Sequence, residues 1–160
     1  MAERKGLAIW DRKFLTWQEL GLVALTLLFT SLSTVLGHTI MDLQGIEDTA
    51  NQIGIEKLLR AIPFGLAFVR IACQAAITEE IIIRGYLFKK LFEKHKILGI
   101  EVSGLFFAFL HGPTNLGSWI IYTSPGFILA YLYYKTDYLI YPIAVHLINN
   151  AWSVVAFCYS

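Results

Sequence analysis

Charged residues are scarce in this chain and cysteine is nearly absent. Asp, Glu, Lys and Arg together make up 16% of the 160 residues, and the formal net charge is only +1. A nucleic-acid partner would require a clustered basic face, so this charge balance argues against one. The two cysteines, Cys73 and Cys158, lie in apolar stretches without the spacing of a metal or redox motif. We interpret both as small buried side chains.

Apolar residues are correspondingly abundant, at 56% of the chain, which is typical of membrane proteins. Five apolar segments can be drawn, at residues 17–40, 62–88, 97–111, 118–134 and 138–159. The first exceeds the roughly 20 residues that cross a bilayer and is too long for the core of a cleaved signal peptide. The predicted fold is therefore all-α, a polytopic integral membrane bundle of about five transmembrane segments. Residues 1–16 would form a cytoplasmic N-terminal segment and residues 17–160 the membrane domain.

The loops predict the orientation. Basic residues precede the first segment (Arg4, Lys5, Arg12, Lys13) and follow the second (Lys89, Lys90, Lys94, Lys96), whereas the loop between these segments is rich in acids. Because Lys and Arg favour the cytoplasmic side, the N-terminus is predicted to be cytoplasmic and the C-terminus to lie outside. The acidic loop is predicted to hold a short surface helix from about residue 46 to 60.

The stretch ITEEIIIRGYLF, residues 77–88, places ionisable side chains midway along the second segment. A charge at the bilayer centre costs about 2.5–3.5 kcal/mol, so it normally faces the protein interior and has a partner. Glu80 and Arg84 are four residues apart, on one helix face, in the favourable order for an ion pair. Glu79 points about 100° away, with Ile83 four residues on. One carboxylate is left for another use, unless it is protonated and serves only helix packing.

Two histidines are predicted to reach the same depth. His111 ends the third segment, because Pro113 disfavours helical conformation at Gly112. His146 lies within the last segment, with Asn150 four residues on and on the same face. Counted from the cytoplasmic ends, the three segments place Glu79, His111 and His146 about 15, 22 and 14 Å deep. Helix tilt can absorb this spread, so we expect a site between the second, third and last segments.

The other two histidines carry weaker signals. His95 belongs to a basic loop and is expected to be solvated, and His38 ends the first segment as an interfacial residue.

A carboxylate and a histidine around one water molecule are the parts of a hydrolytic site, with the acid as general base. A second histidine with a nearby amide can donate hydrogen bonds to an oxyanion. No serine or cysteine has the setting of a nucleophile, so water is the expected attacker. Glu79, His111 and His146 could instead bind a divalent metal such as zinc, which accepts these ligand types. The sequence leaves the cofactor open.

Three motifs occur in order on successive segments: Glu-Glu-x-x-x-Arg at Glu79, Glu80 and Arg84, Phe-x-x-x-His at Phe107 and His111, and His-x-x-x-Asn at His146 and Asn150. Over about residues 60–155 the chain resembles the CPBP family, which comprises the type II CAAX prenyl proteases and the bacteriocin-processing or Abi proteins. The resemblance implies an intramembrane endopeptidase in a bacterial cell membrane.

The resemblance also implies roles for the six candidate catalytic residues: Glu79 and His111 activate water, His146 and Asn150 form the oxyanion site, and Arg84 fixes Glu80. The expected substrate is a bacteriocin precursor or another membrane-associated peptide or protein. The alternative is a non-catalytic self-immunity or membrane-regulatory protein of the same fold. A proton carrier would use similar residues, but no repeat symmetry supports it.

The better-known prenyl proteases look longer than this chain. We therefore expect thinner cavity walls or a homo-oligomer in which a second copy completes them.

Overall fold

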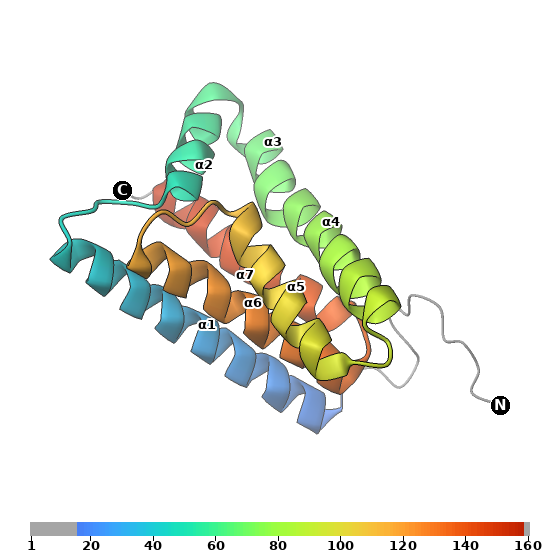
Figure 1. Cartoon of the computed structure of the whole chain (residues 1–160). Coiled ribbons are helices and arrows are strands. Elements are labelled where there is room, and N and C mark those ends of the chain that lie inside the picture. Colours follow the sequence, from blue (N-terminus) through green and yellow to red (C-terminus); the bar gives the residue numbers. More distant parts are fainter. Residues whose placement is uncertain (1–15, 159–160) are drawn as a thin grey trace.

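The computed structural model describes residues 16–158, and this part of the chain is helical with no strand (Figure 1). Its elements in chain order are α1 (Trp17–Leu43), α2 (Ala50–Ala61), α3 (Phe64–Phe68), η1 (Val69–Ala75), α4 (Ala76–Glu80), η2 (Ile81–Leu91), α5 (Lys96–Leu110), α6 (Leu116–Thr136) and α7 (Ile140–Phe157). The all-α prediction is confirmed. The predicted cytoplasmic segment lies outside the described residues, apart from Thr16.

Four of these elements, α3 to η2, follow one another without a break and form a single long helix over residues 64–91. This helix begins where Pro63 forces the preceding Ile62 into an extended conformation, with φ −131° and ψ 158°. Two of its stretches, η1 and η2, are π-helical, a form that is rare and frequent at functional sites. Glu79 and Glu80 lie in the short α-helical stretch between them.

The long helix forms one edge of the bundle and α1 the opposite edge, with α5, α6 and α7 between them (Figure 1). The α1 and α6 helices pack along each other, α5 packs on α6, and α7 packs against η1 and α4. Close approach depends on glycine, because a Cβ added at Gly126 would collide with the carbonyl oxygen of Gly104, and one at Gly117 with that of Gly37. The short helix α2 lies across one end of the bundle, near the C-terminal end of α7.

The α1 helix shows the pattern of a membrane helix. Its buried residues are mostly small or hydroxylated: Thr26, Thr30, Ser33, Gly37 and Met41. Its exposed residues include large apolar side chains: Leu25, Leu28, Phe29, Leu32, Val35 and Leu36. In water this arrangement would be unfavourable, whereas helices in lipid pack through small residues and expose apolar ones.

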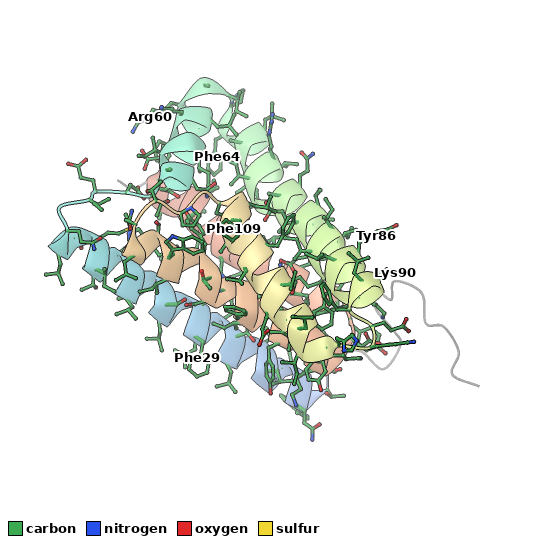
Figure 2. The ribbon with its side chains drawn as sticks, viewed as in Figure 1. Phe29, Arg60, Phe64, Tyr86, Lys90 and Phe109 are labelled. Atoms are coloured by element: carbon green, nitrogen blue, oxygen red, sulfur yellow. The ribbon has the colours of Figure 1, made fainter. Side chains whose placement is uncertain are left out.

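Apolar side chains also project from other outer faces, and Figure 2 shows Phe29 and Tyr86 on opposite sides of the bundle. Within the described part, two helices, α1 and α7, are long and apolar enough to cross a membrane. Length and composition thus support membrane spans, and the arrangement of five spans stays a prediction.

Two local predictions need correction. Cys158 is exposed and Cys73 only half-buried, so neither is the buried side chain that we expected. The short helix predicted from about residue 46 begins at Ala50, because the side chain of Thr49 accepts a hydrogen bond from the backbone of Gln52 and caps the helix there.

Candidate active site

Glu80 lies at the centre of a buried ionic cluster. Both Glu80 and Arg84 have side chains with no exposed surface, and Arg84 Nη1 donates to Glu80 Oε1 at 3.0 Å. Arg84 Nη2 donates to the backbone carbonyl of Gly126 on α6 at 2.8 Å. His146 Nδ1, on α7, lies 2.9 Å from the same Glu80 oxygen. The predicted ion pair is present, and it also binds a histidine.

The partners of the two histidines fix their tautomers. A carbonyl oxygen only accepts, so His111 Nδ1 donates to the carbonyl of Phe107, at 2.8 Å. His146 Nδ1 likewise donates to the carboxylate of Glu80. In a neutral imidazole the other nitrogen, Nε2, is then an acceptor. Both rings therefore present Nε2 to the site.

Glu79 faces these two nitrogens. Its Oε2 lies 3.9 Å from His111 Nε2 and 3.9 Å from His146 Nε2. These distances are too long for direct hydrogen bonds, and Glu79 Oε2 is buried without a hydrogen-bond partner among the described residues. A water oxygen placed about 2.8 Å from Glu79 Oε2 and from both Nε2 atoms is within hydrogen-bond distance of all three. The angle at that oxygen between Glu79 Oε2 and either Nε2 atom would be about 90°. A water molecule has two hydrogens, so at this point it can donate to two of the three acceptors, and it contacts all three when one imidazole carries a proton on Nε2 and donates to it.

Asn150, the sixth candidate residue, lies one turn beyond His146 but is engaged elsewhere. Its Nδ2 donates to the backbone carbonyl of Ile71 at 3.1 Å. The neighbouring Asn149 donates to the hydroxyl of Thr30 at 3.2 Å. The structure thus brings Glu79, Glu80, Arg84, His111 and His146 together, and holds the amide of Asn150 against the long helix.

Two aromatic rings enclose the histidines. Phe107 is buried, with its ring centre 4.5 Å from that of His111 and 5.4 Å from that of His146. The guanidinium of Arg84 lies 4.9 Å from the same ring. On its other side, His111 stacks on Tyr122, with the ring centres 4.7 Å apart and the planes 20° apart.

Phe107 belongs to one of the three sequence motifs, whereas Tyr122 and Gly126 were not predicted. The last two lie on α6, which carries none of the three motifs, so no spacing could have identified them. Tyr122 also links the site to α2, because its hydroxyl lies 2.6 Å from that of Thr49.

A cavity of about 780 Å³ leads to the site. His111 and His146 line it together with residues of α1, α2, α6 and α7. His38, which we expected to be only an interfacial residue, also lines this cavity. The two histidines are therefore reachable by a ligand of peptide size.

The donor atoms of Glu79, His111 and His146 are of the types that zinc accepts, but their spacing fits zinc poorly. Two ligands of a tetrahedral zinc ion lie about 3.3 Å apart, whereas the carboxylate is 3.9 Å from each imidazole nitrogen. No group of three His, Cys, Asp or Glu residues in the described part of the chain is arranged to hold a metal. We therefore derive no step through a metal.

The part of the chain that forms this site is similar to known proteins. Residues 61–152, more than half of the chain, match the family described as type II CAAX prenyl endopeptidase Rce1-like. This range contains all three motifs. No solved structure matches the chain.

Two curated bacterial relatives are similar over a comparable stretch. The UPF0177 protein YvdC of Lactococcus lactis subsp. lactis (strain IL1403) is 32% identical over 107 residues, covering 67% of this chain and 41% of the relative. The "Putative membrane peptidase YdiL" of Bacillus subtilis (strain 168) is 31% identical over 110 residues, covering 68% of this chain and 43% of the relative. The chain thus spans about two fifths of the length of these relatives. The match over residues 61–152 confirms the resemblance seen in the three motifs, and the chain belongs to the type II CAAX prenyl endopeptidase Rce1-like family.

Proposed function

We propose that this protein is a membrane-embedded endopeptidase that hydrolyses a peptide bond with a water molecule activated by Glu79. The observation that carries the proposal is the position of Glu79 Oε2, which is buried and equally distant, at 3.9 Å, from the Nε2 atoms of His111 and His146. A scaffold would gain nothing from this arrangement, because a buried acceptor without a hydrogen bond destabilises the fold. Membership of the family supports the same class of chemistry.

In the proposed reaction, water binds between Glu79 Oε2 and His111 Nε2 and donates one hydrogen to each. Glu79 takes up a proton as the water oxygen attacks the carbonyl carbon of the substrate. The negative charge that develops on the carbonyl oxygen is stabilised by His146 in its imidazolium form, whose Nδ1–H is held by Glu80. Glu79 then gives the proton to the leaving nitrogen as the C–N bond breaks, which yields a carboxylic acid and an amine.

Asn150 would contribute a second donor to the oxyanion if its amide leaves the carbonyl of Ile71 when substrate binds. Glu80 and Arg84 have positioning roles, since they hold the ring of His146 and do not reach the water.

The proposed setting is a five-span bundle in a bacterial cell membrane with a cytoplasmic N-terminus. A peptidase in a membrane is in line with the printed name of the Bacillus subtilis relative, and the substrate is proposed to be a membrane-associated peptide or membrane protein. Reporter fusions to the loop at residues 44–49 and to the loop at residues 92–95 test this topology. They should report opposite sides of the membrane, and the same side for both would contradict it.

The activity is tested on purified protein in detergent, with wild type, Glu79→Gln and His111→Ala incubated with a peptide library that includes prenylated members. Cleavage is followed by mass spectrometry, with chelator and then with added zinc. We expect wild type to cleave, and both variants to lose at least about a thousandfold in rate. The matched control is Glu101→Gln on α5, an exposed glutamate that should change nothing.

Full activity of Glu79→Gln would refute the proposed general base. A folded wild type that cleaves no peptide, yet protects cells from a bacteriocin equally well with Gln at position 79, would favour the self-immunity role.

A further inference from the structure

The cavity continues from the two histidines as a groove between α1 and α7. Each of the two helices contributes residues three or four positions apart, which lie on one helix face. These are Leu27, Ser31, Thr34, Val35 and His38 on α1, and Ile148, Asn149, Trp152 and Ser153 on α7. Three apolar side chains among them are strongly exposed: Val35 at 64%, Ile148 at 47% and Trp152 at 75%. The groove therefore has an apolar rim and is open along its side.

The groove also carries hydrogen-bonding groups at intervals. Ser31 and Thr34 lie on the α1 side, and Asn149 and Ser153 lie on the α7 side. Thr34 and Asn149 already donate to Thr30, which leaves their side-chain oxygens to accept from a peptide N–H. An acyl chain has no use for such groups. A peptide must be unwound for its carbonyl to be attacked, and in an apolar environment its freed backbone groups require hydrogen-bond partners. The lining thus fits an extended peptide better than a lipid tail.

The part of the groove beside α2 is acidic. Asp48 and Glu56 both line the cavity there, and His38 faces them from α1. Burial raises the pKa of the Asp48 carboxyl, the backbone N–H of Thr49 and His38 lower it, and Glu56 raises it. Because both carboxylates line this part of the cavity, a cationic ligand group placed there would be attracted to both.

We infer that this groove binds an extended, apolar segment of a membrane peptide or protein that carries a Lys or Arg side chain, which is held by Asp48 and Glu56. The inference rests on the proposed function for the direction of the chain toward His111 and His146. It names the substrate class as apolar segments with a basic residue at a set distance from the cleaved bond.

Binding is tested separately from cleavage, with the Glu79→Gln variant in detergent and a fluorescent apolar peptide. The peptide carries one Lys, moved along its length, and the matched peptides carry norleucine or Glu at the same place. Anisotropy should show about tenfold tighter binding of the best Lys peptide than of its norleucine counterpart. Asp48→Asn and Glu56→Gln should each remove most of that difference.

Two further variants protect the test from misfolding. Glu47→Gln alters an exposed carboxylate that does not line the cavity, and should leave the preference unchanged. Glu56→Lys should reverse the preference toward the Glu peptide, which a misfolded protein could not do.

Equal binding of the Lys, norleucine and Glu peptides at every position would overturn the inference. Charge-selective binding without cleavage by wild type would uphold this groove and count against the proposed protease activity instead.

Discussion

Replacing Arg84 by Met tests whether the buried ionic cluster is held together as the geometry indicates. The guanidinium of Arg84 makes three contacts: Glu80 Oε1 at 3.0 Å, the carbonyl of Gly126 at 2.8 Å and the ring of Phe107 at 4.9 Å. Methionine is similar in length and leaves the apolar contact, but removes both hydrogen bonds and the charge. The carboxylate of Glu80 then stays buried with only His146 as a partner.

The expected loss follows from the burial of the pair. A hydrogen bond to a charged group contributes about 1.5–3 kcal/mol, and removing one partner of a buried ion pair costs about 3–5 kcal/mol. Because neither Glu80 nor Arg84 has exposed side-chain surface, screening by solvent does not reduce this value. We therefore expect Arg84→Met to lower the free energy of unfolding by about 3–5 kcal/mol.

The double variant Glu80→Leu with Arg84→Met separates stability from activity. It leaves no unpaired charge, so its stability should return to within about 1–2 kcal/mol of wild type. Peptide cleavage should not return, because His146 has lost the acceptor of its Nδ1–H.

Unfolding is measured in mixed detergent micelles by titration with denaturing detergent, followed by near-UV circular dichroism. Lys89→Met is the control, since it breaks the pair with Asp137, whose side chains are 19% and 53% exposed, and should cost less than about 1 kcal/mol. If Arg84→Met were as stable as this control, or the double variant less stable than either single one, the reasoning would be wrong.

Two further predictions concern α6. Gly126→Ala should lower the free energy of unfolding by about 1–3 kcal/mol, since its Cβ would collide with Gly104. The control Gly21→Ala has open space around it and should leave the melting temperature unchanged or raise it. Equal melting temperatures for the two variants would contradict this prediction. Tyr122→Phe keeps the ring on His111 but loses the hydroxyl contact to Thr49, so KM should rise up to about fivefold at nearly constant kcat. A fall in kcat alone in steady-state assays would instead assign the hydroxyl to the chemistry.

Relations within one helix were predictable from the sequence. The spacing of four residues between Glu80 and Arg84 predicts their ion pair, and Pro113 predicts the end of α5, where His111 caps the helix. Both relations depend only on residue spacing within a helix and on the effect of proline on the residue before it, and both can be read from the sequence. Counting residues from the loops also predicts similar depths for Glu79, His111 and His146, and in the structure the Nε2 atoms of both histidines lie 3.9 Å from Glu79 Oε2.

Relations between helices were harder to predict. No pattern in the sequence indicates that α6, which lacks a motif, supplies the carbonyl of Gly126 to Arg84 and the ring of Tyr122 to His111. Such contacts depend on the rotation of each helix about its axis, which is set by packing of small residues such as Gly104 against Gly126. Asn150 shows the same limit, because its amide faces Ile71 although it lies one turn from His146.

The shared oxygen of Glu80 explains why an ion pair lies beside Glu79. A carboxylate alone could orient His146, but a charge without a partner is costly to bury, and the side chain of Glu80 has no exposed surface. Arg84 Nη1 and His146 Nδ1 both donate to Oε1 of Glu80, so the carboxylate of the ion pair also fixes the orientation of the His146 ring. The Nε2 of His146 is thereby directed to the point that Glu79 and His111 also face. In the proposed reaction the adjacent glutamates thus have two different tasks, because Glu79 must be free to accept a proton, whereas Glu80 is held by Arg84 and His146.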